Sequence, residues 1–316
     1  MSTYLITGIA GFIGSNIARA LLAQGAQVRG IDNFVTGKRA NLEDIKEVDF
    51  IEGTIEDPET CARACHGVDF VFHEAALASV PRSVEDPVSS NSANVTGTLN
   101  MLVAARNAHV RRVLYAGSSS AYGDQPTLPK REDMVPDPIS PYAVSKLAGE
   151  HYMRSFTRVY GLETVTLRYF NVFGPHQDPS SQYSGVLAKF SLGMLEGRTP
   201  VIYGDGSQSR DFTFIENVVN ANLLAMAAPA EKVSGHVFNV ATEQRITLND
   251  AVQSLRELTG YSGAVEHAPA RNGDIAHSLA DISRARAAFG YKPAVSFHEG
   301  LRRTLLWYRG LAASAW

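Results

Sequence analysis

Three glycines spaced three residues apart lie between a short apolar run and a helical pattern. Residues 4–7 are typical of a buried strand, the turn Gly8-Ile9-Ala10-Gly11-Phe12-Ile13-Gly14 follows, and apolar residues then recur at helical spacing from Ile17 to Leu22. Such glycines permit a tight turn and a close approach of the backbone to a pyrophosphate, and the helix N-terminus supplies free N–H groups. This order of elements predicts a dinucleotide-binding α/β unit.

Strand and helix patterns continue to alternate along the first half of the chain. Strands are predicted at residues 28–31, 69–73 and 113–116, and a long helix over residues 91–109. The alternation predicts an α/β fold, a Rossmann-type doubly wound parallel sheet. Ligands of such sheets bind beyond the carboxyl ends of the strands, and the run Ser118-Ser119-Ser120 falls at one of these ends.

An aspartate closes the second predicted strand. The carboxylate of Asp32 can accept hydrogen bonds from both ribose hydroxyls of a dinucleotide, and it would repel a 2′-phosphate. The sequence therefore favours NAD over NADP, although Lys38 and Arg39 follow closely and leave that preference open. The small residues Ala75 and Ala76, after a later strand, would let the backbone approach the cofactor.

A tyrosine and a lysine four residues apart, Tyr142 and Lys146, share one face of a predicted helix. A free tyrosine has a pKa of about 10 and is a poor base at neutral pH. A neighbouring ammonium group favours the phenolate, which can accept a proton from a sugar hydroxyl. The pair alone is weak evidence, and its weight comes from the glycine turn and the serine run that precede it.

The composition is that of a globular protein of about two domains, with 45% hydrophobic and 19% charged residues in 316. A formal net charge of −3 gives no reason to expect a nucleic-acid or membrane-surface partner. No apolar run approaches the ~20 residues that span a bilayer, and no signal-like segment precedes the first strand. Two cysteines provide neither a metal site nor a disulfide framework. We expect a cytoplasmic protein that binds no metal.

Taken together, these motifs resemble the extended short-chain dehydrogenase/reductases, and more narrowly the UDP-hexose 4-epimerases that act on UDP-N-acetylglucosamine. The resemblance covers nearly the whole chain. It is carried by the glycine turn, by Asn94-Val95-x-Gly97-Thr98, by the stretch from Arg168 to Pro175, and by Gly204-Asp205-Gly206-x-x-x-Arg210-Asp211-Phe212. It implies a bound NAD that takes a hydride from C4 of the sugar and returns it to the opposite face.

The resemblance also implies roles for individual residues. Tyr142 matches the catalytic base, Lys146 the residue that binds the nicotinamide ribose, and Ser118 the residue that hydrogen-bonds the reacting sugar hydroxyl. The positions expected to contact NAD are Gly8, Gly11, Phe12, Ile13, Gly14, Asp32, Asn33, Ile55, Ala75, Ala76, Asn94, Tyr142 and Lys146. The positions expected to contact the UDP-sugar are Ser118, Ser119, Ser120, Asn171, Val186, Tyr203, Arg210, Arg271, Asp274 and Ser278.

One position departs from the family pattern. Many relatives carry an aspartate at the position of Thr54 to contact the adenine amine, so adenine recognition here would rest on the Ile55 backbone or on other groups.

We expect an NAD-binding domain over residues 1–170 and a mainly UDP-sugar-binding domain over residues 171–316. A predicted strand at residues 237–240 would return to the first domain. Arg210 and Arg271 are the phosphate candidates, because a guanidinium group bonds phosphate oxygens bidentately. A homodimer packed through the helices at 91–109 and 142–160 is an expectation at the level of the family.

Ser278 falls where the family has its pocket wall. Relatives restricted to non-acetylated sugars carry a tyrosine there, and relatives that also accept N-acetylated sugars carry a small residue. An N-acetyl group must turn over with the sugar ring, and a phenol would occupy that space. The resemblance therefore implies UDP-N-acetylhexosamines as substrates, with UDP-glucose and UDP-galactose also accepted. Acceptance of the uronic acid forms stays open.

Two alternatives from other classes of protein remain. A nucleotide-sugar 4,6-dehydratase or a UDP-glucuronate decarboxylase begins with the same oxidation at C4. Dehydratases carry an aspartate and a glutamate directly after the catalytic threonine, and decarboxylases a glutamate two residues before the tyrosine matching Tyr122; here these positions are Ser119 and Ser120. A non-catalytic NAD-sensing protein could use the same fold, but the intact set of Ser118, Tyr142 and Lys146 argues against it.

Overall fold

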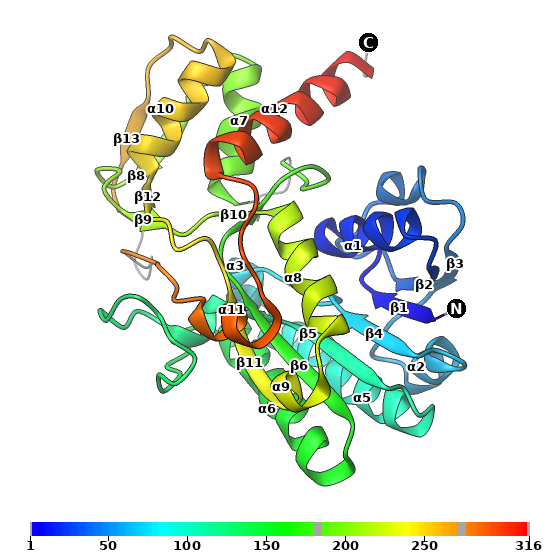
Figure 1. Cartoon of the computed structure of the whole chain (residues 1–316). Coiled ribbons are helices and arrows are strands. Elements are labelled where there is room, and N and C mark those ends of the chain that lie inside the picture. Colours follow the sequence, from blue (N-terminus) through cyan, green and yellow to red (C-terminus); the bar gives the residue numbers. More distant parts are fainter. Residues whose placement is uncertain (1, 180–184, 271–275, 315–316) are drawn as a thin grey trace.

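A seven-stranded parallel sheet forms the frame of the molecule (Figure 1). The computed structural model describes residues 2–179, 185–270 and 276–314. The order of the strands is β11-β6-β5-β4-β1-β2-β3, so the direction in which the chain adds strands reverses between β1 and β4. The predicted fold class is confirmed. The strands are β1 (Thr3–Thr7), β2 (Gln27–Asp32), β3 (Asp49–Glu52), β4 (Phe70–His73), β5 (Arg112–Ser118), β6 (Glu163–Tyr169) and β11 (His236–Val240).

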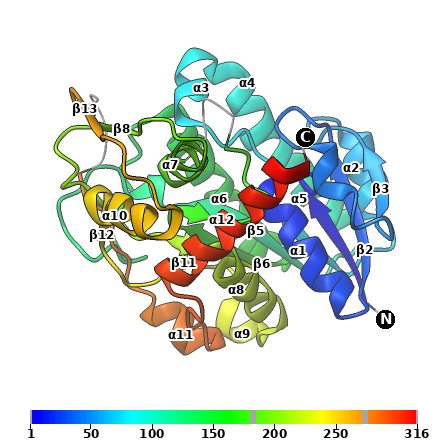
Figure 2. The same ribbon diagram turned by 90° about the horizontal axis from the view of Figure 1, so that it is seen from above.

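Helices cover both faces of this sheet (Figures 1 and 2). Helices α2, α5 and α6 pack together on one face, and α1 packs against α8 on the other. Each face has its own cluster of buried apolar side chains, which is why the central strands are buried along most of their length. The bounds of these helices are α1 (Phe12–Ala23), α2 (Pro58–Cys65), α5 (Gly97–Asn107), α6 (Pro141–Tyr160) and α8 (Ile215–Ala227).

The helix expected over residues 91–109 differs from the prediction. It is preceded by α3 (Val80–Glu85), begins as α4 (Pro87–Asn91), passes through a π-helical turn at Ser92–Thr96, and continues as α5 to Asn107. The early start follows from local capping, because the Asp86 side chain accepts a hydrogen bond from Ser89 N at 3.0 Å and Pro87 suits a first helical turn. The π-helical turn contains Asn94, one of the predicted site residues.

The last third of the chain divides its elements between two places. The strand predicted at residues 237–240 is β11, which pairs in parallel with β6 and so adds the seventh strand to the sheet. Helices α7, α10 and α12 pack on one another beyond the sheet, at the top of Figure 1. Short strand pairs join this part: β7 with β10, β9 with β12, and β8 with β13.

The remaining elements are short except for three helices. Their bounds are β7 (Val172–Phe173), α7 (Val186–Leu195), β8 (Val201–Tyr203), β9 (Ser209–Arg210), β10 (Thr213–Phe214), α9 (Ala230–Val233), β12 (Ile246–Thr247), α10 (Leu248–Thr259), β13 (Glu266–Ala268), α11 (Ser283–Phe289) and α12 (Phe297–Ser314), with 3-10 turns at Arg39–Leu42 and Ser119–Tyr122.

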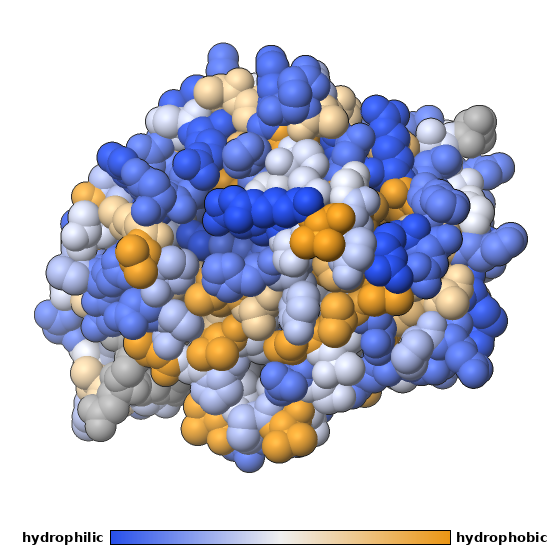
Figure 3. Space-filling view, turned by 90° about the horizontal axis from the view of Figure 1, so that it is seen from below, coloured by the Kyte–Doolittle hydropathy of each residue, from blue (hydrophilic) through white to orange (hydrophobic). Residues whose placement is uncertain are grey.

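On the face seen from below, several hydrophobic residues lie close together across the middle and lower part, among hydrophilic ones (Figure 3). Within the described ranges, no helix has both the length and the hydropathy needed to cross a membrane.

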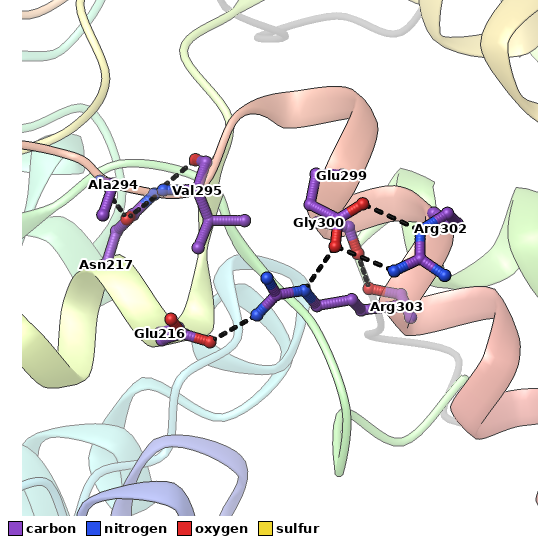
Figure 4. A network of polar contacts seen from close by, with 9 residues as sticks. Glu216, Asn217, Ala294, Val295, Glu299, Gly300, Arg302 and Arg303 are labelled. Atoms are coloured by element: carbon purple, nitrogen blue, oxygen red, sulfur yellow. Dashed lines mark hydrogen bonds and ion pairs between the residues drawn. The ribbon is translucent and has the colours of Figure 1, made fainter.

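A buried asparagine attaches the C-terminal helix to the sheet-covering helix α8 (Figure 4). Asn217 is 1% exposed, and its Oδ1 accepts hydrogen bonds from Ala294 N at 2.9 Å and Val295 N at 3.0 Å. Its Nδ2 donates to Val295 O at 2.8 Å. The preceding residue, Glu216, makes an exposed ion pair with Arg303 on α12. The buried amide therefore holds the segment that leads into α12.

These adjacent residues give a matched test of the attachment. Asn217→Ala leaves three backbone groups without partners, two of them on the buried Val295, so we expect the free energy of unfolding to fall by roughly 2–4 kcal/mol. Glu216→Ala removes only an exposed ion pair and is expected to lower it by less than about 1 kcal/mol. Urea denaturation measures both, and equal losses in the two variants would contradict this account.

Candidate active site

The predicted cofactor residues lie around one cavity at the carboxyl ends of the central strands. The cavity opens where the strand order reverses, between β1 and β4, the point at which sheets of this kind bind ligands. Asn94 is the one predicted cofactor residue that does not line it. Those that do are Gly8, Gly11, Phe12, Ile13, Gly14, Asp32, Asn33, Ile55, Ala75, Ala76, Tyr142 and Lys146.

The glycine turn brings β1 and β4 together at the floor of the cavity. Gly8 has a φ of 69°, a backbone conformation that side-chain-bearing residues rarely adopt, and a Cβ there would lie 2.8 Å from the Cα of Ala75. Gly11 N donates to Gly8 O at 3.0 Å, and Ser15 N then donates to Gly11 O at 3.1 Å as α1 begins. The first N–H groups of α1 are left facing the cavity mouth without intrahelical partners. This cradle fits the pyrophosphate of a dinucleotide.

Asp32 is held in place by the backbone. Its Oδ2 accepts from Ala10 N at 2.9 Å and its Oδ1 from Phe34 N at 2.8 Å. Burial raises the pKa of this carboxyl, and the backbone hydrogen bonds oppose that rise. The carboxylate therefore lies fixed at the end of β2, where the ribose of a dinucleotide is expected.

The two cations that follow Asp32 both have carboxylate partners. Lys38 Nζ lies 3.1 Å from Asp178, and Arg39 Nη2 lies 2.9 Å from Glu52. Arg39 also stacks over the Phe34 ring, with its Cζ 4.0 Å from the ring centroid. Because their charges are already compensated, these side chains do not favour a 2′-phosphate, and the arrangement supports the preference for NAD.

Asn94 lies behind the cavity wall. It is 1% exposed, and its Oδ1 accepts from Leu77 N at 2.8 Å. Its Nδ2 donates to Ser145 Oγ at 3.0 Å, and Ser145 Oγ donates to Tyr142 O at 2.8 Å. Asn94 thus ties the segment after β4 to the first turn of α6, which makes it a positioning residue in this structure.

His73 is a satisfied buried histidine, as its strand-end position suggested. Its Nδ1 lies 2.7 Å from Thr7 Oγ1, and its Nε2 lies 2.9 Å from Thr98 Oγ1. Because Thr98 Oγ1 donates its own proton to Asn94 O at 2.6 Å, it accepts the hydrogen bond from His73 Nε2. Nε2 therefore carries the ring proton, and Nδ1 accepts the hydrogen bond from Thr7 Oγ1. Burial lowers the pKa of His73 to about 3, with a smaller contribution from Lys146. The ring is neutral and links β1, β4 and α5.

Ser118 and Tyr142 meet at the edge of the cavity. Ser118 ends β5, and its side chain lies close enough to the Tyr142 phenol to lower the pKa of that phenol. Ser120 donates to Ser118 Oγ from its backbone N at 3.2 Å and from its Oγ at 2.8 Å. These two bonds occupy the Ser118 lone pairs and leave its proton for the phenol oxygen. The backbone N of Tyr142 donates to Ser83 Oγ at 3.0 Å, which fixes the start of α6.

Lys146 has a hydrogen-bond partner other than the Tyr142 phenol. Lys146 Nζ donates to Ala116 O at 2.9 Å and lies 4.9 Å from the Tyr115 ring centroid. Burial raises the pKa of Tyr142, and the opposing contribution comes from the Ser118 hydrogen bond. Burial also lowers the pKa of Lys146 to about 8. The ammonium group is therefore directed at a carbonyl, and Ser118 is the neighbour that favours the phenolate.

The predicted substrate residues gather around a second pocket, between α7 and the short strands. Asn171, Val186, Tyr203 and Arg210 all line it. Arg210 Nη1 donates to Ser209 O at 2.9 Å and to Ala276 O at 3.3 Å, which holds the guanidinium group at the rim. The second pocket is thus lined by segments that lie far apart in the sequence.

Ser278, Ser119 and Ser120 take different positions. Ser278 is 9% exposed and accepts a hydrogen bond from Asn171 Nδ2 at 3.2 Å, so it lies beside the second pocket. Ser119 and Ser120 are half-buried in the turn after Ser118. Arg271 and Asp274 lie outside the described residues.

Several lining residues were not among the predicted ones. In the cofactor cavity these include Glu74, Gly117 and Tyr169, and in the second pocket Gln177 and Leu248. Glu74 and Gly117 adjoin residues already singled out at strand ends, so strand-end position was an available signal. Gln177 and Leu248 carried no such signal, because their pocket is assembled from distant segments.

Known proteins resemble the chain over almost its full length. The NAD dependent epimerase/dehydratase family matches residues 4–241. A UDP-glucose 4-epimerase of Mycolicibacterium smegmatis is 39% identical over 310 residues, which cover 96% of this chain and 98% of that protein.

Two solved structures superpose closely on the described fold. A UDP-N-acetylglucosamine 4-epimerase from Methanobrevibacter ruminantium, in complex with UDP-N-acetylmuramic acid, has a TM-score of 0.92 at 39% identity over 98% of this chain and 99% of that one. A Thermus thermophilus UDP-glucose 4-epimerase in complex with NAD has a TM-score of 0.88 at 37% identity over the same shares. With its cradle for a pyrophosphate and Asp32 at the ribose position, the chain belongs to the NAD dependent epimerase/dehydratase family and uses NAD as its cofactor.

Proposed function

We propose that the protein is a UDP-sugar 4-epimerase that interconverts UDP-N-acetylglucosamine with UDP-N-acetylgalactosamine, and UDP-glucose with UDP-galactose. The observation that carries this proposal is the meeting of Ser118, Tyr142 and Lys146 at the edge of the cofactor cavity. Relatives that act on glucose and on N-acetylglucosamine derivatives support the substrate class.

Each of the three side chains has a task in this reaction. Tyr142 takes the proton from the sugar 4-hydroxyl and later returns it, while Ser118 hydrogen-bonds the same hydroxyl and favours the phenolate. Lys146 holds the nicotinamide ribose. Bound NAD supplies the acceptor and donor of hydride at C4. The chain's own contribution is to orient the sugar and to move one proton at the Tyr142 oxygen.

The second pocket is proposed to hold the UDP moiety. Arg210 offers a guanidinium group to a phosphate, and Asn171 offers an amide beside it. Val186 and Tyr203 provide apolar surface for the uracil and ribose. Arg271 and Asp274 are proposed to complete the site on the strength of their motif positions alone.

The related activities fit the site less well. Dehydratases need carboxyl groups at the positions of Ser119 and Ser120, and decarboxylases need one at the position of Ser120, but both residues supply only hydroxyls. A hydroxyl with a pKa far above neutrality cannot exchange protons in the way that a carboxylate does. A non-catalytic NAD-sensing role would leave the Ser118–Tyr142 hydrogen bond without a purpose.

We also propose a homodimer, formed through α6 as expected, but with α3 and α4 beside it in place of the helix at 91–109, because none of the exposed large hydrophobic residues in the described ranges lies at 91–109. Helices α3, α4 and α6 pack side by side. They carry large apolar residues that are exposed to solvent, with exposed fractions of 64% for Val84, 78% for Val88 and 52% for Val144. A second copy would cover them.

Removing the phenol oxygen is the direct test of the proposed base. Tyr142→Phe is expected to keep the fold and the bound NAD but to lower the epimerisation rate by roughly 10²–10⁴-fold, toward the upper end. Ser118→Ala should reduce it less, on the order of 10²–10³, because only one hydrogen bond is lost. Turnover is measured by chromatography of the UDP-sugars. A Tyr142→Phe variant with near-normal turnover would sink the mechanism.

The Asp32 carboxylate is expected to decide between the two dinucleotides. NAD should copurify with the protein, because the reaction regenerates its oxidant. Asp32→Ala is expected to loosen NAD and to reduce discrimination against NADP by roughly tenfold or more, since it removes the charge that repels a 2′-phosphate. Fluorescence titration measures both affinities. A wild-type protein that is isolated without cofactor and depends on added NADP would overturn this role.

Ser278 is proposed to set the size of the sugar that is accepted. Ser278→Tyr should suppress the acetylated reaction selectively, by roughly 5- to 150-fold, because a phenol would occupy the space of the N-acetyl group. UDP-galactose turnover should be largely kept. Ser278→Ala is the matched control, and it preserves the small volume. Equal loss for all four substrates in Ser278→Tyr, or no acetylated activity in the wild type, would show that Ser278 is not the pocket wall.

A further inference from the structure

A carboxyl group that the proposed reaction does not use lies in the cofactor cavity. Glu74 follows β4 directly and lines the cavity together with Tyr142, Lys146 and Tyr169. Its Oε1 accepts a hydrogen bond from Tyr169 Oη at 2.9 Å. Its Oε2 is buried, and no residue that the structure describes supplies a hydrogen-bond partner for it. An ionised oxygen that is buried without a partner is costly, so this carboxyl group has a raised tendency to hold a proton.

Tyr169 joins Glu74 to Asn222. Its Oη accepts from Asn222 Nδ2 at 2.9 Å, and its proton has two acceptors within reach, Glu74 Oε1 at 2.9 Å and Asn222 Oδ1 at 3.1 Å. Glu74 Oε1 therefore has a donor available, whereas Oε2 has none among the residues that the structure describes. The wall of the cavity thus holds either a neutral carboxyl group or a negative charge at this place.

Two groups around this end of the cavity change charge near neutral pH. Burial raises the pKa of Glu74 to about 7, with Tyr169 and Lys146 opposing the rise, and burial lowers the pKa of Lys146 to about 8. Of the four other titratable groups facing them, Tyr142 is the proposed base and the remaining three stay neutral. The four are Tyr142 on α6, Tyr169 on β6 and Tyr115 on β5, whose pKa values are raised, and His73 on β4, whose pKa is lowered.

We propose that Glu74 sets the balance between oxidised and reduced cofactor through the charge on its carboxyl group. The nicotinamide ring is cationic in NAD⁺ and neutral in NADH, the two differing by one hydride. An ionised Glu74 stabilises NAD⁺ relative to NADH, and a protonated Glu74 does not. The inference rests on the part of the proposed function that puts the nicotinamide beside Tyr142 and Lys146, and it does not depend on which sugar binds.

The test is a redox titration of the holoenzyme, with wild type beside Glu74→Gln. Glutamine keeps the shape and the hydrogen-bonding capacity of the side chain but cannot ionise. The midpoint potential of the bound cofactor is measured from the dihydronicotinamide absorbance, against mediator dyes, from about pH 6 to about pH 8.5. Lys146 titrates in both proteins, and loss of the Glu74 charge lowers its pKa, so the difference between the two curves reports the Glu74 charge together with the accompanying change at Lys146.

The expected difference has a defined sign. At the high end of this range, Glu74→Gln should favour NADH over NAD⁺ roughly tenfold more than wild type does, a midpoint more positive by about 30 mV for a two-electron couple. At the low end, where wild-type Glu74 is protonated, the difference should shrink to about twofold or less. Glu52→Gln, the same substitution at an exposed residue paired with Arg39, should match wild type throughout.

If Glu74→Gln releases its cofactor, a second variant still tests the proposal. Tyr169→Phe removes the donor to Oε1, which raises the pKa of Glu74 and should move the wild-type pH dependence to higher pH. The proposal would be overturned if the midpoint potentials of wild type and Glu74→Gln changed with pH in parallel. It would also be overturned if Tyr169→Phe left the pH dependence of the midpoint potential where it is in wild type. A wild-type protein without bound NAD would contradict the cofactor assignment itself.

Discussion

The close contact between β1 and β4 at the reversal of strand order is the constraint on which the site depends. Because Gly8 lacks a side chain, its backbone can lie against Ala75, and the two strand ends open a cavity between them. The N-terminus of α1 faces one end of this cavity and the start of α6 faces the other. A dinucleotide is long enough to use both. A side chain at Gly8 would push the strands apart and displace the pyrophosphate cradle from the proposed catalytic residues.

Buried polar side chains fix the position of the start of α6 relative to the contact between β1 and β4. Ser83 binds the backbone N of Tyr142, and Asn94 reaches its carbonyl through Ser145. Deeper in the same helix, Glu150 forms a buried ion pair with Arg168 of β6. Buried polar networks of this kind specify geometry more than they add stability. The position of the phenol oxygen is therefore set from three sides by residues that never touch a substrate.

The part of the cavity lined by Tyr142, Lys146 and Glu74 holds more than one cation beside one phenol. Lys146 is bound to the Ala116 carbonyl and lies close enough to Glu74 that each shifts the pKa of the other. The cavity thus holds a phenol beside a cation and a carboxyl group, and the charges of the last two depend on each other. An enzyme that must both take up and return a hydride needs the two cofactor states close in free energy, and a coupled set of this kind can provide that.

The sequence by itself determined the fold class and most of the cofactor site, because the glycine turn, Asp32 and the Tyr142/Lys146 pair are local patterns set by backbone sterics and helix periodicity. The direction of the Tyr142 pKa shift, the position of Asn94 behind the wall and the π-helical turn that carries it depend on long-range hydrogen bonds and burial. The pocket around Asn171 and Arg210, and the unpaired oxygen of Glu74, were decided only by tertiary structure. Each arises where strands and helices far apart in the chain pack together. A residue pattern within one segment of the sequence does not predict contacts between such distant segments.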